Sequence, residues 1–433
     1  MTTRTTSLDG RLRALTVVGL LASVGIRLVL LPTEGYRGDL DQFVKWVHDI
    51  AAAPLGQAYR LDLGFPPVMT YLFAGMGAVI GAFGHVIDAA DPFARAIVKT
   101  PASVADIALA VCAAFALRER PRLAAAAFLA LALNPVLIYV SAWWGQFESI
   151  YVLAVLVSVL LVTRGHVDLA AVALGVALMT KPQAAFFVVP IAAWLLGATG
   201  WRSTVRFGLI AVATVAILWL PFVPGGGIQG YVRNLDAYGN QTFSIASLRA
   251  WNAWWIMQEA SGGQFLADTA TLFGPITGRT MAFALAALGE VVVFLAVFQA
   301  PTRRNLALGV ATSVLVCFSL LTAMHERYAF GALVFLTLGF AEPRIRAIWL
   351  VFNVVFMANL LAATPASTAI ADILPEGGPV SIVGSLAILV LTGASLWVLV
   401  HPAARPEEDA TSAGQELREP APEGRSIPAQ VMR

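Results

Sequence analysis

The sequence predicts an all-α, polytopic integral membrane protein with about twelve transmembrane helices. The chain has 433 residues, of which 58% are apolar and only 12% are charged, whereas soluble domains carry about 25% charged residues. Its mean hydropathy is +0.77. The apolar residues also occur in runs long enough to cross the roughly 30 Å apolar core of a bilayer as helices. These three observations exclude a soluble fold.

Charge and cysteine content exclude several other classes of protein. The chain contains 28 Lys and Arg and 26 Asp and Glu residues, a formal charge of +2, so a nucleic-acid partner is not indicated. The two cysteines, Cys112 and Cys317, both lie within apolar runs, where a thiol usually acts as a small apolar side chain. We therefore expect neither a disulfide nor a thiolate metal site.

The predicted spans follow one another along most of the chain. They lie near 13–33, 97–117, 123–141, 147–163, 167–180, 183–199, 207–223, 281–299, 306–323, 328–342, 346–362 and 380–400. The stretch 66–87 is also apolar, but we expect an outer interfacial or re-entrant helix there, because a thirteenth span would disrupt the charge pattern of every later connection. Residues 1–400 then form one transmembrane domain with outward-facing segments at 34–96 and 224–280, followed by a disordered cytoplasmic tail at 401–433.

The distribution of arginine predicts which side faces the cytoplasm. Alternate short connections are rich in arginine, while those between them hold only Lys181 and Arg327. The arginines of the first set are Arg118, Arg120, Arg122, Arg164, Arg202, Arg206, Arg303, Arg304, Arg344 and Arg346. Short cytoplasmic connections collect positive charge. We therefore expect both termini in the cytoplasm and a multi-pass protein of the cell membrane.

Polar residues gather on the predicted outer side, although the segments that carry them lie far apart in sequence. Ionisable groups near the membrane are costly and usually functional. Arginine and lysine bind phosphate, and an aspartate can accept the proton of a hydroxyl group. The set predicts the displacement of a lipid phosphate from a sugar by a hydroxyl. Its members are Asp39, Asp41, Gln146, Glu148, Lys181, Gln183, Asn252, His325, Glu326 and Arg327.

These residues stand in motifs that resemble the glycosyltransferase C superfamily. The motifs are GDL at 38–40, FPP at 65–67, Lys-x-Pro-x(4)-Asp at 99–106, GQFE at 145–148, KPQ at 181–183, NAWW at 252–255 and HERY at 325–328. Over residues 34–330 the pattern is most similar to bacterial mannosyltransferases related to the second mannosyltransferase of GPI-anchor assembly. It is more distantly similar to polyprenol-dependent mycobacterial mannosyltransferases and to the dolichol-dependent glucosyltransferases of N-glycan assembly.

The resemblance implies a polyprenyl-phosphate-sugar donor, an extracytoplasmic site, inversion at the anomeric carbon and no nucleotide sugar. We expect a glycan or glycolipid acceptor and no cofactor. Asp39 stands at the position of the family's catalytic acidic residue. Lys181 and Gln183 match an element of the lipid-phosphate pocket, and the segment from His325 to Tyr328 matches one near the donor phosphate. Relatives commonly have aspartate where this chain has Glu148. The sequence therefore indicates a membrane glycosyltransferase, most similar to mannosyltransferases.

Several plainer interpretations remain open for single residues. Asp39 can instead cap a helix, in which case Asp41 would be the base. Lys181 and Arg27 can be helix-end cations that extend to the membrane interface. Gln146 and Asn252 can satisfy backbone groups, and His325 can donate to a carbonyl. Trp143, Trp144, Trp254 and Trp255 can belong to an interfacial aromatic belt.

Two alternatives concern the function as a whole. Asp39 and Glu148 could hold Mg²⁺, although the five histidines have no ligand spacing. The protein could also be a transporter or flippase of lipid-linked sugars, which would place charged residues near the middle of the bilayer and show two related halves. The sequence shows no such internal repeat.

Overall fold

The computed structural model describes residues 2–402, with the side chains of residues 10–240 and 242–402. Within this part of the chain, eight helical segments are long and apolar enough to cross a membrane. Some of them are built from two or three consecutive elements. They are α1 (Thr2–Leu30), α4 (Pro92–Ala116), α5 (Pro121–Ala132) with α6 (Pro135–Ile138) and η2 (Tyr139–Trp144), η3 (Pro182–Phe187) with α9 (Val188–Thr199), α10 (Trp201–Trp219) with η4 (Leu220–Gly225), α13 (Gly278–Gln299), α16 (Pro343–Ala363) and α18 (Pro379–Val400).

The remaining elements are shorter or less apolar. The helices are α2 (Arg37–Ala51), η1 (Leu55–Arg60), α3 (Pro67–Ala82), α7 (Glu148–Val162), α8 (Val167–Leu178), α11 (Gly227–Gln241), α12 (Ala253–Ala260), α14 (Arg303–Leu320), α15 (Phe330–Thr337) and α17 (Thr368–Ile373). The strands are β1 (Ser247–Leu248), β2 (Thr271–Phe273), β3 (Ile276–Thr277) and β4 (Met324–His325). Strands β1 and β4 pair in parallel, and β2 and β3 form an antiparallel hairpin.

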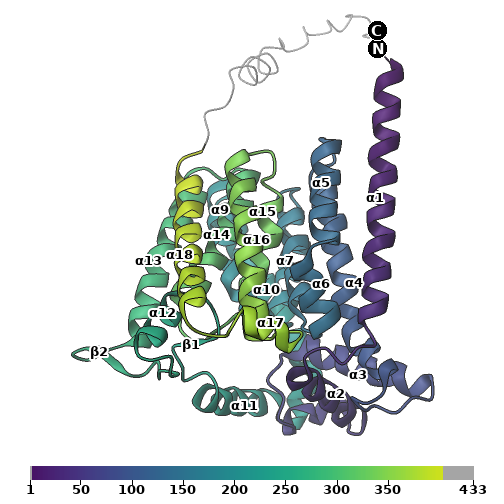
Figure 1. Cartoon of the computed structure of the whole chain (residues 1–433), viewed down its shortest axis with the longest axis vertical. Coiled ribbons are helices and arrows are strands. Elements are labelled where there is room, and N and C mark those ends of the chain that lie inside the picture. Colours follow the sequence, from purple (N-terminus) through teal and green to yellow (C-terminus); the bar gives the residue numbers. More distant parts are fainter. Residues whose placement is uncertain (1, 403–433) are drawn as a thin grey trace, which may run out of the picture.

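The helices form a bundle with a second layer at one end. Figure 1 shows the long helices standing side by side, with α1 at one edge, and α2, α3 and α11 lying across their lower end. Helix α1 begins and α18 ends at the opposite, upper end. The two described ends of the chain therefore lie on the same side of the bundle, and the segments 34–96 and 224–280 reach the other side.

The prediction of about twelve spans was too high, since eight candidate spans are found among residues 2–402. The predicted spans at 147–163, 167–180 and 328–342 are helices of 15, 12 and 8 residues, which at 1.5 Å per residue are too short to cross alone. The span predicted at 306–323 corresponds to α14. This helix begins with Arg303 and Arg304, and every residue from Asn305 to Ser319 is buried by protein.

Two other predictions concern the first loop and the tail. The apolar stretch 66–87 forms α3, a helix of 16 residues that packs on α2 and is too short for a full span. Which side of the membrane this layer faces stays a prediction. The tail predicted at 401–433 lies, from residue 403 onward, outside the described residues.

A buried ion pair inside the bundle joins α1 to α4. Arg27 Nη2 lies 2.8 Å from Asp106 Oδ2, and the hydroxyls of Ser141 and Ser149 also donate to the Asp106 carboxylate. Arg27 is 2% exposed and Asp106 is 0% exposed. The interpretation of Arg27 as an interfacial cation was therefore wrong, because its charge is neutralised within the protein by an aspartate about 80 residues away in sequence.

Replacing Arg27 with methionine should lower the free energy of unfolding by about 3–5 kcal/mol, because Asp106 would remain buried without a cation. The double variant Arg27→Met, Asp106→Leu should recover most of this loss. Unfolding of the purified protein in detergent measures both effects. Equal destabilisation of the single and the double variant would contradict the assignment.

Candidate active site

Four connections between helices bring most of the predicted residues together at the end of the bundle that carries α2. They are the first turn of α2, the η2–α7 connection, the α8–η3 connection and the α14–α15 connection. These connections carry Asp39; Gln146 and Glu148; Lys181 and Gln183; and His325, Glu326, Arg327 and Tyr328.

The carboxylate of Asp39 is half-buried in the first turn of α2. Tyr36 occupies the N-cap position, so Asp39 is not the helix cap of the plainer interpretation. Its Oδ2 accepts hydrogen bonds from Trp144 Nε1 at 2.9 Å and from the Gln146 side-chain amide. Within residues 10–402, no side chain donates a hydrogen bond to its Oδ1. One oxygen is thus fixed, while the other has no protein donor in this part of the chain.

Glu148 is the first residue of α7 and lies fully buried between two cations. Its Oε1 is 2.6 Å from Lys181 Nζ and 3.4 Å from Arg327 Nε. Its Oε2 is buried without a hydrogen-bond partner. Burial lowers the pKa of the Lys181 ammonium, and the neighbouring Glu148 opposes this shift. Lys181, predicted to bind a phosphate, is therefore engaged by a carboxylate in this structure.

The HERY segment surrounds the guanidinium of Arg327 with polar groups. Arg327 Nη1 lies 2.6 Å from Glu326 Oε1 and 3.3 Å from His325 Nδ1. Burial by itself would raise the pKa of Glu326, but the charge of Arg327 and the contact with His325 lower it to about 2. Burial, and then the charge of Arg327, lower the pKa of His325. The segment thus holds a carboxylate, a guanidinium and an imidazole that is neutral at pH 7.

The indole of Trp144 connects Asp39 to Arg327. Its Nε1 donates to Asp39, and Arg327 Cζ lies 5.2 Å from the ring centroid, within the range of a cation–π contact. Trp144 is 1% exposed, and Trp254 and Trp255 are 5% and 4% exposed. Their interpretation as an interfacial belt was wrong, because all three are buried in protein. One side chain therefore brings the acidic group and the cation into the same site.

Local backbone geometry explains why these connections meet. Gly145, with φ of +94°, ends the π-helical turn η2, and such turns are frequent at functional sites. A Cβ atom on Gly35 would lie 1.9 Å from the carbonyl oxygen of Trp143, so only glycine allows the chain entering α2 to approach η2. Pro182 disfavours a helical conformation at Lys181, whose φ is −148°.

Strand β1 leads to Arg249, a residue that the sequence interpretation missed. β1 pairs with β4, and Arg249 forms a backbone bridge with His325. Arg249 and Ala323 have φ of +64° and +58°; non-glycine residues rarely adopt this conformation, and such strain clusters at functional sites. The side chain of Asn359 holds the turn. Its Nδ2 donates to the Arg249 carbonyl at 2.8 Å, and its Oδ1 accepts from the Trp251 backbone N–H at 3.1 Å.

The Arg249 side chain is more accessible than the other two cations. Its Nε lies 2.9 Å from Glu376 Oε1, and it is 38% exposed, whereas Arg327 is 12% and Lys181 5% exposed. The Tyr36 hydroxyl lies beside its guanidinium, and the Tyr36 ring packs against Trp144. The only sequence feature that could have pointed to Arg249 is its position, as an isolated arginine three residues before the NAWW motif.

Two predicted residues lie apart from this cluster. Asp41 is 47% exposed and lies 3.5 Å from Arg37 Nε. Asn252 is fully buried at the N-cap of α12, where its side chain accepts from the amides of Trp254 and Trp255 and donates to the Phe318 carbonyl. Gln183 does lie in the cluster, beside the Tyr328 hydroxyl.

The carboxylates of the Mg²⁺ alternative are already engaged by protein groups. Glu148 lies between Lys181 and Arg327, and one oxygen of Asp39 is bonded by Trp144 and Gln146. Within residues 2–402, no group of three or more His, Cys, Asp or Glu side chains is placed to hold a metal ion.

Comparison with known proteins finds a similarity to one family over part of the chain. Residues 87–237 match the ALG6, ALG8 glycosyltransferase family. The matched part of the chain contains Glu148 and Lys181, whereas Asp39, Arg249 and the HERY segment lie outside it. No curated protein matches the chain. The similarity thus concerns membrane glycosyltransferases, and the family description names neither sugar nor acceptor.

The lowered pKa of His325 predicts that the protein loses stability on acidification. Below the ordinary histidine pKa of 6.5, the unfolded chain binds a proton that the native state does not bind until its lower pKa is reached. Stability therefore falls as the pH decreases through this interval. His325→Gln should flatten this part of the profile, measured as Tm from about pH 8 to 5. The control His48→Gln, at a side chain that is 60% exposed, should leave the pH profile of Tm unchanged. Equal profiles of the wild type and His325→Gln would contradict this role of His325.

Proposed function

We propose that this protein is a membrane glycosyltransferase that transfers a sugar from a polyprenyl-phosphate donor to a hydroxyl of a cell-envelope glycan or glycolipid, with inversion at the anomeric carbon. The observation that carries the proposal is the position of Asp39, which has one oxygen without a donor among residues 10–402 and is linked through a single indole to Arg327. The match of residues 87–237 to the ALG6, ALG8 glycosyltransferase family supports the same reaction class.

Asp39 is suited to act as the general base. Trp144 and Gln146 hold its Oδ2, which fixes the carboxylate while Oδ1 accepts the proton of the acceptor hydroxyl. The hydroxyl oxygen forms the new bond to the anomeric carbon. The bond between that carbon and the phosphate oxygen breaks, and the lipid phosphate leaves with the electron pair. Attack on the face opposite the leaving group inverts the anomeric centre.

The lipid phosphate must be bound by a cation whose ion pair within the protein can be broken at low cost. Lys181 and Arg327 are buried beside Glu148, and breaking a buried pair costs several kcal/mol. The pair of Arg249 and Glu376 is far more exposed, with side chains 38% and 40% accessible, and such pairs contribute about 1 kcal/mol or less. We therefore assign the first contact with phosphate to Arg249. Arg327 contributes through Nη2, which takes part in none of the hydrogen bonds found within residues 10–402.

The sugar we propose is mannose, on the basis of the motif resemblance. Glucose is the alternative, because the more distant relatives include glucosyltransferases. The donor is a lipid-linked sugar in both cases. The same assay distinguishes them, since the two donors differ only in the hexose.

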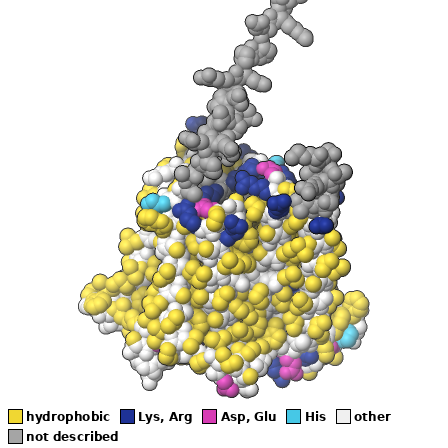
Figure 2. Space-filling view, turned by 45° about the horizontal axis from the view of Figure 1, so that its top comes forward, with side chains coloured by type: hydrophobic (Ala, Val, Ile, Leu, Met, Phe, Trp, Pro, Cys, Tyr) yellow, Lys and Arg dark blue, Asp and Glu magenta, His cyan; other side chains and the backbone are white. Residues whose placement is uncertain are grey.

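The surface charge supports an extracytoplasmic site. Figure 2 shows Lys and Arg side chains gathered at the upper end of the molecule, above a broad hydrophobic belt. This is the end at which α1 begins and α18 ends, opposite α2. Since positive charge collects on the cytoplasmic side, we propose that both termini are cytoplasmic and that Asp39 faces the other side of the cell membrane.

The decisive experiment incubates the purified protein in liposomes with labelled polyprenyl-phosphomannose or polyprenyl-phosphoglucose and candidate envelope acceptors. Incorporation of label into the acceptor is the expected result. Asp39→Asn should lower the rate of transfer by about 100-fold or more, with donor binding retained, because the base is lost and the shape of the site is kept.

The matched control is Asp49→Asn, the same change near the end of α2, where Asp49 contacts Lys45. It should leave the rate unchanged. Loss of transfer in Asp41→Asn but not in Asp39→Asn would move the base to Asp41, and full transfer by both variants would contradict the mechanism. Movement of the lipid-linked sugar across the liposome membrane without transfer would favour a flippase.

Arg249→Gln should raise the KM for the donor by about tenfold or more, because a charge-assisted hydrogen bond to the phosphate is lost. The kcat should change little, since Asp39 remains in place. The control Arg233→Gln removes a positive charge from exposed α11 at the same end of the molecule and should not affect the KM. An unchanged KM in Arg249→Gln would assign the phosphate to Arg327 alone.

A further inference from the structure

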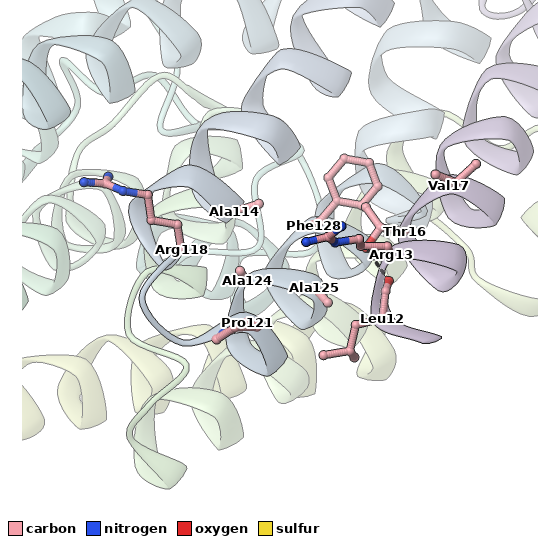
Figure 3. Close-up of a pocket in the computed structure, with 10 residues that line it drawn as sticks. All are labelled: Leu12, Arg13, Thr16, Val17, Ala114, Arg118, Pro121, Ala124, Ala125 and Phe128. Atoms are coloured by element: carbon pink, nitrogen blue, oxygen red, sulfur yellow. Dashed lines mark hydrogen bonds between the residues drawn. The ribbon is translucent and has the colours of Figure 1, made fainter. Parts of the chain in front are cut away.

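A groove opens between α1 and the α4–α5 connection, at the end of the bundle opposite Asp39. It has a volume of about 540 Å³, within the range of small-ligand sites. Its walls are mainly apolar, with Leu12 and Val17 on one side and Ala124 and Phe128 on the other. Figure 3 shows Arg13 and Arg118 at opposite sides of this groove, with the guanidinium of Arg118 turned away from α1.

The groove exists because α1 touches the bundle over only part of its length. A Cβ atom on Gly19 would lie 2.2 Å from Leu129 Cδ2, and the Ser23 hydroxyl donates to the Ala132 carbonyl, so α1 and α5 are in close contact there. Nearer its beginning, Leu12 and Val17 line the groove, and apolar side chains of α1 are exposed from Leu15, at 51%, to Val29, at 71%. Only 17% of its apolar window is buried in the protein.

Three arginines from separate connections lie near one another at this end of the bundle, and one of them, Arg118, also lines the groove. Arg118 follows α4, Arg164 follows α7 and Arg303 begins α14. Arg118 and Arg164 both lie on the ring of Phe115, at 4.5 Å and 4.7 Å from its centroid. Arg303 Nη2 lies 3.5 Å from the carbonyl oxygen of Thr163, the residue before Arg164, and the pKa of Arg164 is lowered by burial first and then by the charges of Arg118 and Arg303.

No acidic side chain neutralises these arginines within the described residues. None of the three belongs to an ion pair found there. By contrast, Arg206 and Arg304 at the same end of the bundle are paired with Asp168 and Glu342. Cations that repel one another at a fixed position are stabilised by a bound anion.

We propose that this site binds an anionic phospholipid of the adjacent leaflet, with its phosphate on Arg118, Arg164 and Arg303 and one acyl chain in the groove. Arg118 joins the two features, because its stem lines the groove while its guanidinium lies at Phe115. Basic pockets between transmembrane helices bind anionic lipid headgroups in this way. The lipid would also pack against Leu12 and Val17 of α1, the helix that leads into α2 and Asp39.

The test uses the full-length protein in nanodiscs of phosphatidylcholine with one fifth phosphatidylglycerol (roughly the anionic fraction that charges a leaflet). The lipids that remain bound after extraction into detergent are quantified by mass spectrometry. We expect phosphatidylglycerol to be enriched on the wild type. The variant Arg118→Gln, Arg164→Gln, Arg303→Gln should lose this enrichment by about tenfold or more, because each arginine near a surface contributes about fivefold in affinity.

A matched control removes the same charge from exposed arginines at the same end: Arg122→Gln, Arg202→Gln, Arg346→Gln. It should keep the enrichment. Equal loss in both triple variants, or equal retention in the cluster variant and the wild type, would overturn the proposal. Wild type without any preference for phosphatidylglycerol would overturn it as well, whether or not the cluster variant folds. Displacement of the lipid by millimolar inorganic phosphate alone would show a free-phosphate site and would also overturn it.

Discussion

The buried carboxylate of Glu148 is the constraint on which the candidate site depends. It is completely removed from solvent, and a carboxylate in such a place persists only if cations neutralise it. Lys181 and Arg327 supply this charge from two distant parts of the chain. The pairing fixes the ends of α8 and α14 relative to the start of α7, and it places Arg327 against Trp144 and hence near Asp39.

This arrangement divides the charged residues into two groups. Lys181, Glu148 and Glu326 are each at most 5% exposed and hold Arg327 in position, so they build the site. Asp39 and Arg249 are more accessible and retain the freedom to meet a substrate. The strained turn at Arg249 and its bond to Asn359 show that the position of this arginine is fixed by the fold.

Much of the fold and part of the site could be predicted from the sequence. The eight spans correspond to predicted runs, because a bilayer requires long apolar helices and this requirement is readable in one dimension. Helices α7, α8, α14 and α15 were overcounted as spans, because an apolar helix packed against other helices has the same composition as one that faces lipid. Arg27 was misinterpreted for a related reason, since its partner Asp106 lies far away in sequence.

The sequence by itself determined the fold class, the approximate positions of the long helices and the short segments that carry Asp39, Glu148, Lys181 and Arg327. Composition and spacing suffice for these, because they follow from local chemistry and the thickness of a membrane. Only the tertiary structure decided which cation neutralises Glu148, that Trp144 joins Asp39 to Arg327, and that Arg249 enters the site. These depend on contacts between segments from 33 to more than a hundred residues apart, for which a single sequence carries no local signal.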